Sequence, residues 1–124
     1  GAPLKALALE RLRDFRKAGK LFDLIVLDPP KFAPSAAHAE RAAKAYKDIN
    51  ILGFRLLKPG GFLMTYSCSG GVGLELFQKI IADSALDAGR QARIVRRLSG
   101  AADHPVALNF PEGEYLKGLL LQAD

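Results

Sequence analysis

The stretch "LFDLIVLDPPKF" (residues 21–32) limits how this chain can fold more than any other. Leu21–Leu27 lacks a clean alternation of apolar and polar residues, which indicates a strand buried on both faces, as in a parallel sheet. Pro29 and Pro30 have no backbone N–H to donate, and proline pushes the residue before it into an extended conformation. The pattern therefore predicts a strand that ends in a stiff turn and carries Asp28 to the edge of a parallel sheet.

Helical and strand patterns alternate along the rest of the chain. Apolar residues recur at spacings of three and four across residues 37–57, and Lys58–Gly61 predicts a break after that helix. Residues 115–122 fit a buried strand or a short helix, and Gly118 favours the strand. This order predicts an α/β fold with a parallel sheet and right-handed crossovers. The expected helices cover residues 3–18, 37–57 and 72–88, and the further strands cover residues 62–67 and 92–98.

Two reactive side chains follow neighbouring strands of this predicted sheet. Asp28 ends the first strand, and Cys68 follows the second. Ligands of open α/β sheets bind outside the carboxyl ends of the strands, so we expect the acid and the thiol at one edge. A thiolate can add to an electron-poor ring carbon. The alternatives are a solvated acid at a rigid turn and a cysteine packed as a small apolar residue.

Gly71-Val72-Gly73 precedes a predicted helix, as the glycines of a dinucleotide-binding turn do. Leu76 stands where the third glycine of that motif belongs. We therefore interpret these residues as a tight turn.

Composition narrows the class of protein. The 124 residues correspond to one domain, and 49% of them are hydrophobic, as in globular proteins. Cys68 is the only cysteine, which rules out an intrachain disulfide and fits a reducing compartment such as the cytoplasm. His38 and His104 are isolated, so no metal site is expected. No apolar run reaches the roughly 20 residues of a membrane span, and the net charge of +5 is compatible with RNA as a partner.

Four segments together resemble a known family. "FDLIVLDPPKF", "LLKPGGFLMTYSCSG", "DHP" and "FPEGEYLKG" occur in the order seen in S-adenosylmethionine-dependent methyltransferases. The chain is most similar to the bacterial enzymes that form 5-methylcytosine in large-subunit ribosomal RNA, and the resemblance spans nearly all of residues 21–122. It implies a Rossmann-like sheet, mostly parallel with the last strand antiparallel. On that template the strands at 21–27, 62–67, 92–98 and 115–122 are strands four, five, six and seven.

The resemblance also implies what is missing. The glycine-rich loop and the ribose-binding acid of the family have no counterpart in this sequence, and neither does its RNA-binding domain. Residues 1–124 are therefore expected to be a partial methyltransferase domain that lacks the amino-terminal cofactor-binding strands.

The resemblance assigns roles to individual residues. Cys68, as a thiolate, would add to C6 of a flipped cytosine. Asp28 would hydrogen-bond the pyrimidine edge and lie beside the cofactor, S-adenosylmethionine. Two further pairs complete the expected site. Pro29 and Pro30 would present carbonyls to the cofactor and the base, and Lys31 and Phe32 would contact RNA through charge and stacking.

Two other functions remain open at this stage. The first is an amino methyltransferase that grips an adenine or guanine amine with the carbonyls of an acid-Pro-Pro motif, although that chemistry leaves Cys68 without a role. The second is a folded but inactive fragment, which we expect of these residues when they are produced alone. In such a fragment the strand at Leu21–Leu27 would have a free edge that could pair in a symmetric dimer.

Overall fold

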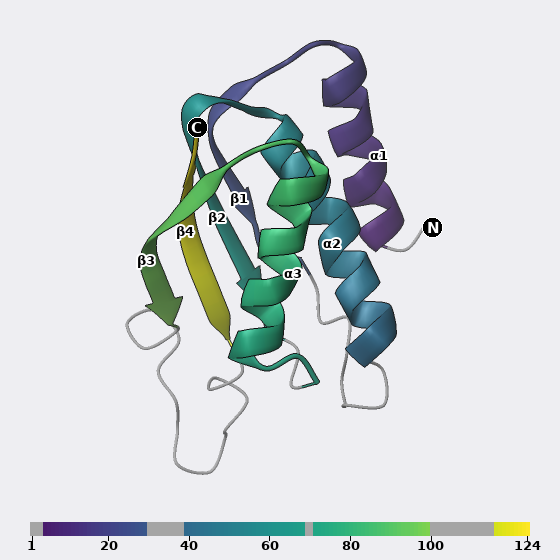
Figure 1. The fold of residues 1–124 in the computed structure, drawn as a ribbon. Helices are drawn as coiled ribbons and strands as arrows, with labels where there is room; N and C mark the ends of the chain where they lie inside the picture. Colours follow the sequence, from purple (N-terminus) through teal and green to yellow (C-terminus); the bar gives the residue numbers. More distant parts are fainter. Residues whose placement is uncertain (1–3, 30–38, 69–70, 100–115) are drawn as a thin grey trace.

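The computed structural model describes residues 4–29, 39–68, 71–99 and 116–124 (Figure 1). Residues 117–123 form a strand, so the strand favoured for the carboxy-terminal segment is confirmed. Every element except β2 lies within two residues of its expected bounds. In chain order the elements are α1 (Leu4–Lys17), β1 (Phe22–Leu27), α2 (Ala39–Arg55), β2 (Leu57–Ser67), α3 (Leu74–Asp87), β3 (Ala92–Ser99) and β4 (Lys117–Ala123).

The four strands form one mixed sheet in the order β1-β2-β4-β3. β1 and β2 are parallel, whereas β4 is antiparallel to both β2 and β3. The predicted α/β class and the antiparallel last strand are therefore confirmed. The sheet was expected to be mostly parallel. Three of its four strands, β1, β2 and β3, do run in the same direction. β4 enters between β2 and β3, so only one of the three strand pairings is parallel.

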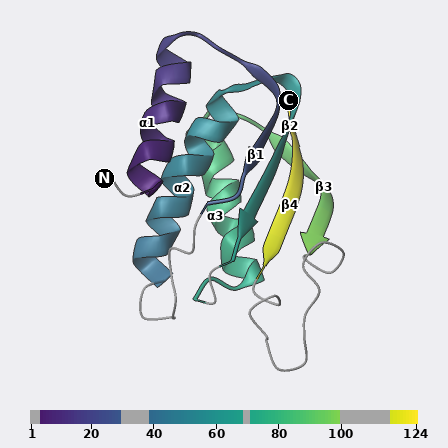
Figure 2. The ribbon, with the colours of Figure 1, turned by 180° about the vertical axis from the view of Figure 1, so that it is seen from behind.

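All three helices lie on one face of the sheet (Figures 1 and 2). α2 is the central helix and contacts both α1 and α3. Alternate residues of β2 and β4 point into the space beneath the helices, as the two-residue period of a strand requires. The core between the two layers contains Tyr46, Phe77, Leu63, Leu119 and Leu121.

The opposite face of the sheet is open to solvent in the part of the chain that the structure describes. Leu24 is 53% exposed and Val26 is 55% exposed, because all the described helices lie on the other face. The ladder register aligns these two residues with Phe62 and Met64 of β2 on the same face. The prediction that residues 21–27 are buried on both faces is therefore wrong for the described residues.

The helix ends before Lys58–Gly61, as predicted, but the following strand begins earlier than expected. These residues belong to β2, which begins at Leu57. The β1–β2 ladder jumps from Phe22↔Leu57 to Leu24↔Phe62, so the extra residues of β2 bulge out of the pairing. A Cβ at Gly61 would lie 2.9 Å from the carbonyl oxygen of Lys58, which explains why glycine is needed there.

The end of the sheet where β2 begins is closed by Arg90. Gly89 ends α3 with a φ of 72°, a value that favours glycine, and so directs Arg90 toward the sheet. The Arg90 guanidinium donates to the carbonyl oxygens of Phe54 (2.7 Å) and Leu57 (2.9 Å). Its Nε also donates to the Asp124 carboxylate at 2.9 Å. One arginine thus ties together the end of α2 and the outer ends of β2 and β4.

Candidate active site

All four described strands have an end at the opposite end of the sheet, where Ser99 of β3 also pairs with Lys117. Leu27 pairs with Thr65 in the parallel β1–β2 ladder, so Asp28 and Cys68 follow their strands at the same edge. β4 runs the other way, and its first residue, Lys117, pairs with Ser67. The neighbouring strands of the predicted site are therefore neighbours in the structure. Among the described residues, this edge carries the Asp28 carboxylate, the Cys68 thiol and the Lys117 ammonium group.

The described side chains at this edge differ in burial. Asp28 is exposed and Pro29 is buried, so the acid projects from a turn that is itself packed. Cys68 is a free thiol of intermediate exposure, which leaves the sulfur within reach of a ligand. Three further predicted site residues, Pro30, Lys31 and Phe32, lie outside the described residues.

A buried polar contact fixes the backbone just before Cys68. Ser67 Oγ donates to the Tyr46 hydroxyl oxygen at 3.0 Å, and both residues are 0% exposed. A buried hydrogen bond is stronger in this low-dielectric setting, and its loss would leave a polar group to be satisfied. The contact ties the end of β2 to the middle of α2.

A second contact of the same kind lies two residues earlier along β2. Thr65 Oγ1 donates to Asn50 Oδ1 at 2.7 Å, and Asn50 Nδ2 donates to the Tyr46 carbonyl oxygen at 2.7 Å. These four residues, Tyr46, Asn50, Thr65 and Ser67, were not predicted to form a group. The sequence does contain a pattern that could have indicated them. Tyr46 and Asn50 are four residues apart and so share one face of α2, and Thr65 and Ser67 are two residues apart and so share one face of β2.

Lys117 was likewise missed as a site residue. Burial lowers the pKa of the Lys117 ammonium, and the negative charge of Cys68 as a thiolate raises it. Burial outweighs the charge, so the pKa of Lys117 lies below its usual value, and Lys117 reaches the edge that carries Cys68 although the two residues are far apart in the sequence. The antiparallel entry of β4 brings them together, and no local pattern reveals it.

Tyr66 packs over the same end of the sheet on its open face. A Cβ built on Gly118 would lie 2.6 Å from the Tyr66 ring, so the ring rests directly against the Gly118 backbone. Glycine inside a strand often marks such a close approach. Gly118 therefore has a packing role in addition to being compatible with a strand.

Gly71-Val72-Gly73 forms the turn that leads into α3, in agreement with the tight-turn interpretation. Val72 is fully buried, and the Gly73 carbonyl accepts a hydrogen bond from the backbone N–H of Phe77. A Cβ on Gly73 would meet no atom within 4 Å, so the glycine is not needed for close packing. Nothing in this turn as described favours a dinucleotide site.

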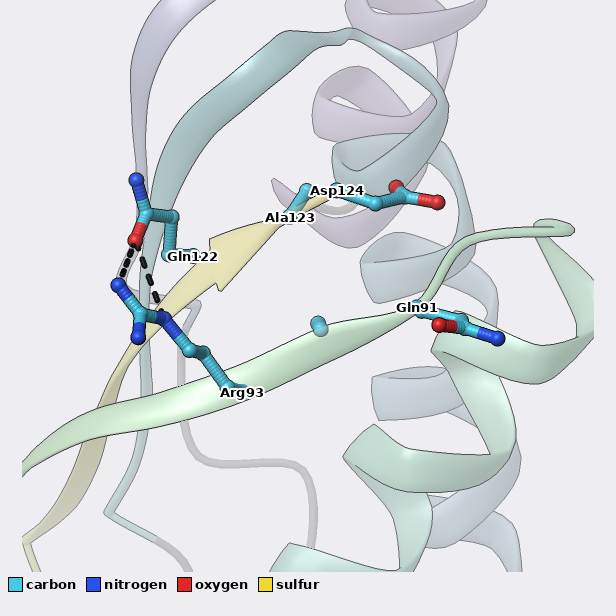
Figure 3. Close-up of a pocket in the computed structure, with 6 residues that line it drawn as sticks. Gln91, Arg93, Gln122, Ala123 and Asp124 are labelled. Atoms are coloured by element: carbon cyan, nitrogen blue, oxygen red, sulfur yellow. Dashed lines mark hydrogen bonds between the residues drawn. The ribbon is translucent and has the colours of Figure 1, made fainter.

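A hollow at the far end of the sheet is unrelated to these groups (Figure 3). It lies between the beginning of β3 and the end of β4, and Gln122 accepts hydrogen bonds from Arg93 across it at 2.6 and 3.2 Å. The described residues contain no cluster of His, Cys, Asp or Glu that could hold a metal ion. No helix among them is long and apolar enough to cross a membrane.

The arrangement of strands and helices is that of methyltransferases. A candidate methyltransferase solved with SAH superposes with a TM-score of 0.70 over 91% of this chain and 29% of its own, at 18% identity. A methyltransferase homologue from Pyrococcus horikoshii gives a TM-score of 0.50 over 88% of this chain and 40% of its own, at 20% identity. At such identities these likenesses define the fold.

Sequence similarity narrows the class to one kind of enzyme. The chain is 59% identical over 112 residues to the ribosomal RNA large subunit methyltransferase I of Tolumonas auensis, covering 90% of this chain. It is 60% identical over 112 residues to the enzyme of the same name from Aeromonas salmonicida, again covering 90% of this chain. The chain spans 28% of the length of each relative. No family model matches the sequence. The predicted resemblance is confirmed: the chain is homologous to part of the ribosomal RNA large subunit methyltransferase I enzymes.

Proposed function

We propose that this chain is the carboxy-terminal part of a methyltransferase domain that forms 5-methylcytosine in large-subunit ribosomal RNA in the cytoplasm, with Cys68 as the nucleophile. The observation that carries the proposal is the position of Cys68. It is a half-buried free thiol at the carboxyl end of β2, beside the end of β1, which presents Asp28. The high identity to ribosomal RNA methyltransferases supports this assignment.

The chemistry requires a bond between Cys68 Sγ and C6 of the cytosine. Formation of this bond moves electron density onto C5, which makes C5 nucleophilic. Asp28 hydrogen-bonds the pyrimidine edge, and transfer of its carboxyl proton to ring N3 neutralises the negative charge that develops there as the sulfur adds. S-adenosylmethionine, when bound, supplies the methyl group. Removal of the C5 proton then returns electrons to the ring, breaks the Sγ–C6 bond and restores the thiolate.

The described residues fit one side of a cofactor and base site. The exposed Asp28 carboxylate can accept hydrogen bonds, and the buried Pro29 holds the turn in place. Pro29 and Pro30 offer carbonyls without competing N–H groups. In this proposal Lys31 and Phe32 contact the RNA, and the rest of the cofactor site comes from the part of the relatives that this chain does not span.

A chimera tests the function directly. In it this chain replaces the matching 112 residues of the Tolumonas auensis enzyme, and methyl incorporation into ribosomal RNA is measured together with the position of the methyl group. We expect Cys68→Ala to abolish 5-methylcytosine formation, and RNA containing 5-fluorocytidine to become covalently attached only when Cys68 is present. Methylation that survives Cys68→Ala, or that appears on an amino group, would support an amino methyltransferase instead.

We propose further that the free edge of β1 lets the isolated chain associate. Among the described strands β1 pairs only with β2, and it exposes Leu24 and Val26. Exposed strand edges pair readily with a second copy. Sedimentation of the 124-residue chain should show a dimer that Val26→Lys converts to monomer. A monomeric unsubstituted chain at high concentration would contradict this proposal.

A further inference from the structure

β3 is an exposed edge strand that carries three arginines. Residues 91–97 are all exposed, and among the described strands β3 pairs only with β4. Its sequence, ARIVRRLS, contains Arg93, Arg96 and Arg97 and no acidic residue. We propose that these three residues, the arginine track, bind the phosphate backbone of the ribosomal RNA beside the reacting base. This inference rests on the proposed function and names a part of the chain that holds the RNA.

Arg93 is held in position by a neutral partner. Its Nε and Nη2 atoms donate to Gln122 Oε1 at 3.2 and 2.6 Å (Figure 3). Gln122 Nε2 in turn donates to the Gly60 carbonyl oxygen at 3.2 Å, which anchors the amide to β2. An amide orients the guanidinium without neutralising its charge. An oriented guanidinium suits a phosphate, because the planar fork of arginine can donate two parallel hydrogen bonds to it.

The other two arginines also have no carboxylate partner among the described residues. Arg97 Nη1 donates to Gln78 Oε1 on α3 at 2.7 Å, and this partner is again a neutral amide. The Arg96 side chain has neither a hydrogen bond nor an ion pair within the described ranges. The ion pairs that the described residues do form use the cations of Lys47, Lys58 and Arg90.

The charge pattern of β3 differs from that of α1, the other element with three arginines. α1 contains Arg11, Arg13 and Arg16, but Glu10 and Asp14 lie between and beside them. Charges of mixed sign are typical of a solvated helix surface. The positive charge of β3 is not opposed within the strand, and arginines gathered on one surface are the electrostatic pattern expected of a nucleic-acid-binding protein.

The arginine track leads toward the reactive end of the sheet. Ser99 ends β3 and pairs with Lys117, at the edge that also carries Cys68. Because only β4 separates β3 from β2, the two strands are about 10 Å apart. Arg97 lies roughly 7 Å before the end of β3, and Arg93 lies about 13 Å before Arg97. An RNA strand bound along the track would therefore pass beside the place where a flipped base meets the sulfur.

RNA binding by the 124-residue chain tests the inference. The probe is a fluorescein-labelled single-stranded RNA of about 20 nucleotides, and fluorescence anisotropy gives the affinity over a series of salt concentrations. The combined variant Arg93→Gln, Arg96→Gln, Arg97→Gln should bind roughly tenfold more weakly at low salt. The slope of log affinity against log salt should fall by about 2, because each lost phosphate contact removes about 0.7. Absence of salt-dependent binding by the unsubstituted chain would overturn the inference.

A matched variant removes the same number of charges from α1. Arg11→Gln, Arg13→Gln and Arg16→Gln change exposed residues on the side of the molecule away from β3 (Figure 1). This variant should lose less than about threefold in affinity, and its salt slope should change by less than about 1. Equal losses in the two variants would mean that net charge alone drives binding, and the arginine track would not be a site.

Two other results would also contradict the inference. If the β3 variant binds RNA normally but self-associates in sedimentation, the arginines serve only to keep an edge strand from pairing. If polyglutamate binds as tightly as the RNA, with the same dependence on the β3 arginines, the partner is an acidic protein.

The Tolumonas auensis chimera gives a test during turnover. The β3 variant should raise the KM for ribosomal RNA several-fold and leave kcat within about twofold, because the arginines bind RNA without touching the reacting atoms. An unchanged KM would count against the arginine track. The proposed function fails separately, when the Cys68→Ala chimera still forms 5-methylcytosine, and that outcome does not alter the comparison of RNA affinities.

Discussion

The two ends of the β-sheet hold their charged residues in different ways. At the end where β2 begins, the Arg90 guanidinium is bonded to the carbonyl oxygens of Phe54 and Leu57 and to the Asp124 carboxylate. At the other end, Asp28 is exposed and Cys68 is half-buried, and the structure gives neither side chain a comparable clamp within the described residues. The closed end is built to hold the fold, whereas the other end keeps reactive groups available to a ligand, as expected of the carboxyl ends of α/β strands.

The largest expected effect is on activity at the reactive end. Asp28→Asn in the Tolumonas auensis chimera should lower kcat about 10²–10³-fold, because an amide has no acidic proton to give to ring N3 as negative charge develops on the pyrimidine. The free energy of unfolding should change by less than about 0.5 kcal/mol, since Asp28 is exposed. Methylation kinetics and urea unfolding measure the two quantities. If Asp28→Asn greatly lowered the free energy of unfolding and left kcat unchanged, the Asp28 end of the sheet would serve stability, as the Arg90 end does.

The converse is expected of Arg90 at the closed end. Arg90→Met should lower the free energy of unfolding by about 2–3 kcal/mol, because it leaves the carbonyls of Phe54 and Leu57 without their partner. Arg93→Met is the control, since Arg93 is exposed and bonds only Gln122 among the described side chains. It should cost less than about 0.5 kcal/mol. Equal losses in the two variants would show that the Arg90 clamp does not stabilise the fold.

Tyr46→Phe and Thr65→Val separate stability from positioning. Each removes one buried hydroxyl between α2 and β2 and should cost about 1 kcal/mol. Only Tyr46→Phe removes a hydrogen bond to the residue next to Cys68, so only it should lower kcat of the chimera, by several-fold. If Thr65→Val lowers kcat as much, the effect comes from general loosening of the helix–strand contact.

The smallest expected effect is the pH dependence of the closed end. The hydrogen bond from Arg90 lowers the pKa of Asp124 below its usual value of 3.8. The interaction therefore adds stability above that value and loses it as the pH falls through the lower, folded-state pKa. Asp124→Asn should be less stable than the unsubstituted chain at pH 7, and the difference should disappear in strong acid. A difference that persists there would mean that the Asp124 charge is not involved.

Local patterns predicted most elements, because the spacing of apolar residues reflects burial beneath the helices. They failed where a distant part of the chain decides the outcome. Leu24 and Val26 look like core residues in the sequence, but only packing from another segment would bury them. Lys58–Gly61 reads as a helix break, but these residues continue β2 as a bulge between Leu57 and Phe62, which are the residues that pair with β1.

The residues of the candidate site also fall into those that local patterns predicted and those that they did not. Asp28 and Cys68 were predictable, because each follows a strand and parallel strands end at one edge. The positions of Tyr46 and Lys117 near this edge were not predicted, because they depend on contacts between distant parts of the chain. Tyr46 reaches β2 from a helix, and Lys117 arrives on a strand that inserts between β2 and β3.

The open face of the sheet has a practical consequence. Leu24 and Val26 are exposed, and together with Phe62 and Met64 on the same face they form an apolar surface in contact with water. Production of these residues by themselves should therefore give a protein that binds hydrophobic dyes and sticks to chromatography resins. Such behaviour would be a property of an uncovered surface, and it would not indicate misfolding of the helices and strands beneath it.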